Sequence, residues 1–288
     1  MTRLDAHQHF WRYQAADYSW IGTGMDVLRR DWLPQDLRLL LEAHGLDGCI
    51  AVQARSSAEE TEFLLELAKR FEWIAGVVGW VDLRAADLTA ELARWQGQAK
   101  LVGFRHLIQD EPNAEALLAD PAFNRGVAAV QTTGMTYDVL VRAPQLRLIP
   151  AFCARHDRHW LVLDHLGKPA IGGGQESDAA WQAQLTRLAA LPHVACKLSG
   201  LVTEVGDRAV DAAELCRYLD TALGLFGSRR LLFGSDWPVC LLKAEYSEVF
   251  ELIDHWAAPL SEDERTALFG GTAARCYRLA LTATRGVS

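Results

Sequence analysis

Short apolar segments recur at regular intervals along the chain, and longer stretches with helical periodicity separate them. No turn signal typical of a hairpin joins neighbouring apolar segments, and the spacing between them suits crossover helices. We therefore predict parallel β-strands in residues 4–11, 48–54, 74–81, 101–108, 134–141, 160–165, 194–200 and 230–236.

The stretches between these segments carry the start signals of helices. Pro34 stands at a first helical position, and Ser56 and Ser57 each precede a glutamate by three residues, as in a capping box. The predicted helices cover residues 34–45, 56–71, 87–95, 114–118, 121–131, 144–156, 179–191, 211–226, 245–257, 261–269 and 272–279. This alternation predicts an α/β protein, a single-domain (β/α)8 TIM barrel over residues 1–288, with an open doubly wound sheet as the alternative.

The composition limits the class of function. The 288-residue chain is 50% hydrophobic and has a formal net charge of -8 without any basic run, so we expect no nucleic-acid partner. No apolar window approaches the length of a membrane span and no leader is visible, so we expect no membrane association. The six cysteines are scattered without a Cys-x-x-Cys pair, which favours reduced thiols and a cytoplasmic location.

The first apolar segment carries two histidines. Residues 4–11 alternate between apolar and polar positions, and the period of two of a strand puts His7 and His9 on one face. Two imidazoles on one rigid element could bind a metal or polarise a carbonyl group. Because a His-x-His pair often arises by chance in a chain with 9 histidines, its meaning depends on the other strand ends.

In a (β/α)8 barrel the C-terminal ends of all strands meet at one mouth, where the chemistry takes place. The polar residues at the predicted strand ends are Gln53, Arg55, Arg105, His106, Tyr137, Asp138, Asp164, His165, Lys197, Ser199 and Asp236. Buried polar groups are costly unless they are paired or used, so their convergence indicates a site. The alternative remains open that Asp164 caps a turn, that His165 is a satisfied core histidine, and that Lys197 extends its ammonium to solvent.

Four motifs along the chain resemble those of a known superfamily. They are Asp5-Ala-His-Gln-His9, Val162-Leu-Asp-His-Leu-Gly-Lys-Pro169, Lys197-Leu-Ser-Gly-Leu201 and Leu232-Phe-Gly-Ser-Asp-Trp-Pro238. With them, the chain resembles the lactonase branch of the amidohydrolase superfamily, which includes sugar-lactone hydrolases and 2-pyrone-4,6-dicarboxylate lactonases. Among these, it is most similar to the L-fuconolactonase-like proteins. The match covers nearly the whole chain, and residues 270–279 resemble the terminal helix of that branch.

The resemblance implies catalytic roles for His7, His9, His165 and Asp236. Relatives with two metals carry a bridging Lys or Glu at the end of the fourth strand and a His on the fifth, where this chain has Arg105 and Tyr137. We therefore expect no dinuclear centre. A single zinc ion on His7, His9 and Asp236 stays open, since three such ligands suit zinc. The resemblance to lactonases implies that turnover requires no metal or other cofactor.

The reaction that the resemblance implies is hydrolysis of a sugar lactone, such as L-fuconolactone or a related 6-deoxy aldonolactone, to the open-chain acid. Asp236 would be the general base for water, and the three histidines would orient the lactone carbonyl. Arg105 and Lys197 are candidates for binding the oxyanion or the sugar hydroxyls. The candidates for the wall of the sugar site are Gln53, Trp32, Tyr137 and Trp237. The expected partner is the small-molecule lactone.

Three other functions remain open. A dicarboxylate lactone would need several convergent arginines, and only Arg55 and Arg105 are clear candidates at the strand ends. A decarboxylase or amide hydrolase of the same superfamily would depend on a metal. A non-catalytic barrel would bind a sugar acid without turnover, although so many ionisable groups at one mouth favour an enzyme.

Overall fold

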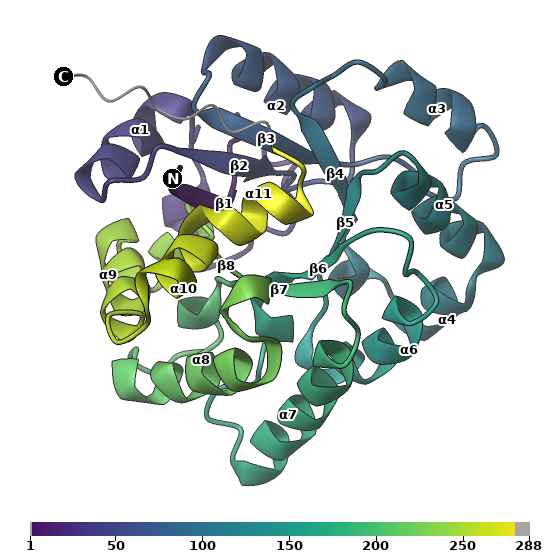
Figure 1. Ribbon diagram of the computed structural model, residues 1–288. Coiled ribbons are helices and arrows are strands. Elements are labelled where there is room, and N and C mark those ends of the chain that lie inside the picture. The colour runs from purple at the N-terminus through teal and green to yellow at the C-terminus, as the bar shows by residue number, and fades with distance from the viewer. Residues whose placement is uncertain (1, 280–288) are drawn as a thin grey trace.

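A computed structural model describes residues 2–279 and shows strands and helices in alternation around a central barrel (Figure 1). The strands are β1 (Leu4–Gln8), β2 (Gly48–Val52), β3 (Ile74–Gly79), β4 (Leu101–His106), β5 (Thr136–Val139), β6 (Leu161–Leu163), β7 (Val194–Leu198) and β8 (Leu231–Phe233). Neighbouring strands pair in parallel and follow chain order from β1 to β8. Just after β8, the backbone N–H of Asp236 donates to the carbonyl oxygen of His7 on β1. The predicted (β/α)8 barrel is confirmed, and the open sheet is wrong.

Helices cover the outside of the barrel. They are α1 (Pro34–Ala43), α2 (Ala58–Arg70), α3 (Leu88–Arg94), α4 (Ala114–Ala119), α5 (Pro121–Thr132), α6 (Ile149–Cys153), α7 (Gln175–Ala189), α8 (Ala212–Phe226), α9 (Tyr246–Trp256), α10 (Glu262–Thr266) and α11 (Thr272–Cys276). The prediction of one α-helix over 144–156 is wrong. A 3-10 helix, η3 (Ala143–Leu148), precedes α6, because Pro150 has no N–H to donate and sits in the first turn of a new helix. No helix within residues 2–279 is long and apolar enough to cross a membrane.

The strands separate two apolar layers, because their side chains alternate between the two faces of the sheet. The outer layer packs against the helices. The inner layer consists of Leu4, Ala6, Ile50, Val52, Val78, Val102, Val162, Ala195 and Leu232, together with Ala273, Cys276 and Tyr277 of the C-terminal segment. In Figure 1, α11 (yellow) lies across this end of the barrel. The base of the barrel is therefore closed by the last helix, where Thr136 Oγ1 donates to the carbonyl oxygen of Cys276 at 2.6 Å.

A bulge in β1 decides which way its histidines face. Asp5 pairs with Cys49, and Gln8 pairs with Ala51. β1 therefore covers three residues where β2 covers two, which is one residue more than regular pairing requires. The extra residue leaves Gln8 facing the helices, with its amide nitrogen 3.1 Å from Cys49 Sγ. His7 and His9 both turn toward the barrel mouth, where they approach Asp236. The predicted common face of the two histidines is confirmed.

Candidate active site

Three histidine side chains meet around Asp236 at the C-terminal end of the barrel. His7 is on β1 and His9 follows it, His165 follows β6, and Asp236 follows β8. Nε2 atoms of His9, His7 and His165 lie 3.3, 3.7 and 3.9 Å from Oδ1 of Asp236. All four side chains are buried. The structure therefore brings together the four residues to which we assign catalytic roles from the sequence.

Hydrogen bonds orient two of the imidazole rings. His9 Nδ1 lies 2.7 Å from the carbonyl oxygen of Val52, which can only accept. His9 Nδ1 therefore donates, and His9 Nε2 is the ring nitrogen that faces Asp236 Oδ1, at 3.3 Å. His165 Nδ1 lies 2.8 Å from Ser199 Oγ, which places a hydroxyl behind this ring.

The backbone around these groups adopts rarely populated conformations. His165 and Asp236 have φ angles of 53° and 59°, in the left-handed region. A Cβ atom on Gly200 would lie 2.5 Å from His165 Nδ1, and one on Gly234 would lie 2.6 Å from His7 Cβ. Glycine is thus required at both positions for the rings to fit. Strained backbone of this kind occurs mainly at functional sites, where the surrounding structure holds it.

A fully buried cluster of charges lies beside His7. Lys197 Nζ is 2.5 Å from Asp138 Oδ2, 2.9 Å from Asp164 Oδ1 and 3.1 Å from His7 Nδ1. Arg105 Nη1 donates to Asp164 Oδ2 at 2.9 Å. Two cations thus match two carboxylates, which is the condition under which buried charges are tolerated.

Gln53 orients the guanidinium of Arg105. Arg105 Nη2 donates to Oε1 of Gln53 at 2.9 Å and also to the backbone carbonyl oxygen of Gln53. Behind this pair, the carboxylate of Glu60 accepts from the backbone N–H groups of Ala54 and Arg55, at 2.9 and 2.7 Å, and fixes the turn after β2. The guanidinium is therefore held in place before any substrate arrives.

Burial and neighbouring charges set the protonation of the site. Burial, with the ammonium of Lys197, lowers the pKa of His7 well below its usual range. Burial lowers the pKa of His165 to about 4. Burial by itself would raise the pKa of Asp236, but His165, His9 and His7 hold it below its usual value. At neutral pH the site therefore offers an ionised carboxylate beside two neutral imidazoles, those of His7 and His165.

A cavity of about 350 Å³ opens above these groups. Its floor carries His9, His165, Asp236 and Arg105, whereas His7 is fully buried behind them. Its apolar wall consists of Met25, Ala54, Leu107, Leu140, Val239 and Leu242. The long segment after β1 contributes to this wall, because Trp20 Nε1 donates to the carbonyl oxygen of Ala54 at 3.0 Å and lines the cavity. The result is a pocket with a reactive floor and an apolar side.

The rim of this cavity carries two ion pairs. Lys168 Nζ lies 3.5 Å from Glu204 Oε1, and Arg142 Nη2 lies 2.9 Å from Asp110 Oδ1. These four residues, with Gln109, are the part of the site that our sequence analysis missed. Lys168 stands in the motif shared with the lactonase branch and could have been found there. The other four lie in or beside short 3-10 helices between the barrel strands and the outer helices, where no periodicity marks which side chains turn inward.

Five of the predicted substrate contacts are not among the described residues that line the cavity. Gln53 and Lys197 are fully buried and hold Arg105 and His7 instead. Side chains of β5 alternate between the two faces of the sheet, and Tyr137 points away from the barrel axis toward the helices. Trp32 and Trp237 pack edge to face, with ring centroids 5.0 Å apart. Burial against other side chains, rather than sugar binding, explains these aromatic residues.

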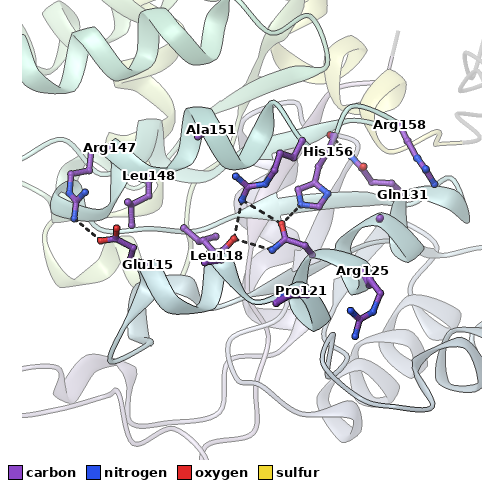
Figure 2. A pocket seen from close by; sticks show the side chains of 14 residues that line it. Glu115, Leu118, Pro121, Arg125, Gln131, Arg147, Leu148, Ala151, His156 and Arg158 are labelled. Carbon is purple, nitrogen blue, oxygen red and sulfur yellow. Dashed lines mark hydrogen bonds and ion pairs between the residues drawn. The ribbon is translucent and has the colours of Figure 1, made fainter.

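A larger hollow of about 770 Å³ lies on the outside of the barrel, among η3, α4, α5 and α6 (Figure 2). Two of its arginines are already engaged. Arg147 pairs with Glu115 at 3.3 Å, as Figure 2 shows. Arg155 donates to the carbonyl oxygen of Leu118 at 2.9 Å. None of the residues around Asp236 borders this hollow. The groups around Asp236 therefore lie at the barrel mouth and not in this outer hollow.

Residues 4–279 match the sequence model of the amidohydrolase family. The chain belongs to this family. It is 57% identical over 285 residues to an L-fucono-1,5-lactonase of Burkholderia multivorans, with 96% of both chains covered. It is 36% identical to an L-fucono-1,5-lactonase of Burkholderia ambifaria, again with 96% of both chains covered. The resemblance to the lactonase branch is thereby confirmed.

Solved structures agree with the fold of this amidohydrolase. Two crystal structures of an amidohydrolase from Burkholderia multivorans, one with bound HEPES and one with bound zinc, have a TM-score of 0.94 and 56% identity. Each covers 97% of this chain and 100% of its own. A 2,6-dihydroxybenzoate decarboxylase is 15% identical with a TM-score of 0.67, over 97% of this chain and 100% of its own, and shares the fold alone.

The residues of this amidohydrolase fit one divalent cation. The ligand atoms of His7, His9 and Asp236 lie within 4.8 Å of one another. His9 Nε2 lies 3.3 Å from Asp236 Oδ1, and an imidazole nitrogen and a carboxylate oxygen are both ligand types that zinc binds. The donation from His9 to Val52 is also the usual support of a metal-binding imidazole. The zinc in the crystal structure of a relative is consistent with this fit.

Proposed function

We propose that this amidohydrolase hydrolyses a sugar lactone to the open-chain sugar acid, with L-fucono-1,5-lactone as its preferred substrate. The observation that carries the proposal is the ionised carboxylate of Asp236 on the floor of the cavity, among three imidazoles and near Arg105. The 57% identity to an L-fucono-1,5-lactonase supports the choice of substrate.

In this proposal Asp236 is the general base. The imidazole contacts to Asp236 are all made to Oδ1, which leaves Oδ2 to accept a proton from water. The water oxygen forms a bond to the lactone carbonyl carbon as its proton passes to Asp236. When the bond between that carbon and the ring oxygen breaks, Asp236 returns the proton to the ring oxygen. The product is a hydroxy acid, and Asp236 is an ionised carboxylate again.

Arg105 is the main stabiliser of the developing oxyanion. Its guanidinium lines the cavity, is held by Gln53 and Asp164, and therefore needs no reorganisation during the reaction. His9 and His165, also on the floor, position the carbonyl and the water. A divalent cation held by His7, His9 and Asp236 would supply further polarisation of the carbonyl or of the water.

The rim and wall of the cavity fit a deoxy sugar. Lys168, Glu204 and Gln109 offer charged and amide groups to several hydroxyls, and the apolar wall around Met25 and Leu242 suits a methyl group. A dicarboxylate fits less well, because the cations of the rim, Lys168 and Arg142, already have acidic partners. The pocket thus favours a neutral polyhydroxylated lactone.

The test is a pH-indicator assay of acid release across a panel of aldonolactones and 2-pyrone-4,6-dicarboxylate, with and without a chelator. Spontaneous hydrolysis without enzyme is the baseline. We expect the largest kcat/KM for L-fucono-1,5-lactone, with activity retained after chelation. Cleavage of the dicarboxylate alone would make the protein a dicarboxylate lactonase. Binding without acid release from any compound would refute lactone hydrolysis altogether.

A further inference from the structure

The outer hollow among η3, α4, α5 and α6 has a chemistry of its own (Figure 2). One face of α5 and one face of the segment from η3 to the turn after α6 form two of its walls, with side chains that recur every three or four residues. They are Pro121, Arg125, Ala128 and Gln131 on α5, and Arg147, Ala151 and Arg155 on the facing segment. Because small alanines stand in the middle of both faces, the walls leave space between them. The volume of about 770 Å³ lies within the range of about 300–1,000 Å³ that is usual for small-molecule sites.

The side chains that line this hollow carry an excess of positive charge. Four arginines and one glutamate line it, in a chain whose formal net charge is -8. Glu115 neutralises only Arg147. Arg125 and Arg158 have no carboxylate partner within residues 2–279, and in Figure 2 both lie toward the same end of the hollow, together with Gln131. Guanidinium groups without a carboxylate partner attract anions and suit the oxygens of a carboxylate or a phosphate.

Two buried side chains at this hollow each have an atom without a hydrogen-bond partner. Gln131 and His156 both line the hollow, with exposed fractions of 3% and 4%. Gln131 Nε2 donates to the backbone carbonyl oxygens of His156 and His159, at 2.8 Å each. Gln131 Oε1 and His156 Nδ1, however, have no partner among the described residues. Buried polar atoms are normally paired, so two such atoms at one hollow indicate a bound molecule that pairs with them.

The contacts of Asn124 show that the unpaired nitrogen of His156 is an acceptor. Asn124 Nδ2 donates to the carbonyl oxygens of Leu118 and Asp120, at 3.0 and 2.8 Å. Asn124 Oδ1 is therefore the atom that lies 2.9 Å from His156 Nε2, and this nitrogen carries the proton. Burial, with the guanidinium of Arg155, lowers the pKa of His156 to about 4, so the ring is neutral at pH 7. His156 Nδ1 thus has a lone pair that can accept a hydrogen bond.

We propose that this outer hollow is a second binding site, which takes a small polyhydroxylated anion such as a sugar acid or a sugar phosphate. Arg125 and Arg158 bind the oxygens of the carboxylate or phosphate. Hydroxyl groups of the same molecule donate to Gln131 Oε1 and His156 Nδ1, directly or through a bound water. Since none of the residues around Asp236 borders the hollow, this site is separate from the proposed lactonase site and does not depend on its function.

The experiment is calorimetric titration of the wild-type protein with four separate probes: D-gluconate, D-glucose 6-phosphate, D-glucose and inorganic phosphate. We expect saturable binding of at least one of the two organic anions, and their relative affinities distinguish a carboxylate from a phosphate ligand. D-Glucose lacks the charge that the arginines bind, and inorganic phosphate lacks the hydroxyl groups of a sugar. Both should therefore bind at least about tenfold more weakly than the better organic anion.

The double variant Arg125→Gln/Arg158→Gln removes both guanidinium groups that have no carboxylate partner. The affinity for the organic anion should fall at least about tenfold. The matched control is Arg70→Gln/Arg187→Gln, which makes the same change in net charge at exposed arginines of α2 and α7 and should bind like the wild type. All four positions are exposed, so both variants should fold, and thermal unfolding checks this.

Three results would overturn the proposal. The first is the absence of saturable binding by either organic anion. The second is an equal affinity in the wild type and the Arg125/Arg158 variant, or an equal loss in the control, since the anion would then bind elsewhere or by net charge alone. The third is binding of inorganic phosphate as tight as that of the organic anions, which would refute the role of the two acceptors. No readout requires lactone hydrolysis, so a failure of the proposed function would be seen separately.

Discussion

The two ends of the barrel interior are equally buried and chemically opposite. At the base, the strands contribute Leu4, Ile50, Val102 and other aliphatic side chains that pack on α11. At the mouth, two or three residues further along the same strands, they contribute charged groups such as Arg105 and Lys197. Burial of apolar side chains therefore stabilises the base, whereas each buried charge at the mouth needs a partner of opposite charge.

One residue links the two ends. Tyr277 belongs to the apolar layer at the base, yet its hydroxyl donates to the carboxylate of Asp138 at 2.9 Å. Asp138 in turn accepts from Lys197, which contacts His7. The apolar end thus supports the polar end through a chain of contacts at this one residue, whereas the other side chains of the apolar layer have no charged partner within residues 2–279. Variants at the two ends should therefore affect activity and stability differently.

The largest effect is expected at the mouth. Asp236→Asn removes the proposed base and should lower kcat/KM for L-fucono-1,5-lactone by about 10²- to 10⁴-fold. The thermal midpoint should change little, because asparagine has the same shape. Steady-state kinetics and thermal unfolding measure both, with the exposed Asp263→Asn as control. Near-normal turnover by the Asp236 variant would show that another group activates the water.

At the base we expect a large loss of stability and little loss of activity. Leu232→Ala leaves a cavity in the inner apolar layer and should lower the free energy of unfolding by about 2–5 kcal/mol. Activity should persist at temperatures where the protein remains folded. Denaturant unfolding measures the loss, and the same change at the exposed Leu39 should cost less than about 0.5 kcal/mol. A loss of kcat in the folded Leu232 variant would contradict the separation of the two ends.

A smaller effect is expected where the two ends meet. Tyr277→Phe removes the hydroxyl that donates to Asp138 and leaves a buried charge with one donor fewer. We expect the free energy of unfolding to fall by about 1–3 kcal/mol. Denaturant unfolding of this variant beside Tyr13→Phe checks it. Equal stability of both variants would mean that the hydroxyl contributes nothing to holding Asp138.

The rim should affect binding rather than chemistry. Glu204→Gln weakens contact with Lys168 and with a sugar hydroxyl, so KM should rise by about tenfold or less while kcat stays close to wild type. Glu262→Gln, on the exposed start of α10, serves as the control in the same kinetic assay. A fall in kcat with unchanged KM would show that Glu204 takes part in the chemical step rather than in substrate binding.

The smallest effect is expected from pH. Asp236 has a lowered pKa and stays ionised, and His165 stays neutral above its pKa of about 4, so titration of these two groups should not change kcat/KM between about pH 8 and about pH 5. The rate should fall as the pH drops through about 4, when His165 gains a proton. Rates corrected for spontaneous hydrolysis measure the profile. A midpoint near 6.5 would show that an imidazole with an ordinary pKa controls the rate.

Much of this arrangement can be predicted from the sequence. The strand periodicity and spacing predict the barrel, and the polar residues at the strand ends predict that His7, His165 and Asp236 converge. The substrate wall could not be predicted in the same way. Tyr137 and Asp138 are neighbours at a strand end, so their side chains lie on opposite faces of the sheet. Only the packing of the strand decides that Tyr137 points toward the helices and Asp138 toward the barrel interior.

The sequence by itself determined the eight-stranded barrel, because local periodicity and spacing mark the strands. Polar residues at the strand ends marked the mouth of the barrel as the candidate site, and the resemblance to the lactonase branch then pointed to His7, His9, His165 and Asp236. Only the tertiary structure decided that Lys197 and Gln53 hold other residues rather than substrate, and that Lys168 and Glu204 form the rim. The physical reason is that these roles depend on distances between strands and loops far apart in the chain. A buried ammonium becomes a positioning group only when two carboxylates and one imidazole surround it.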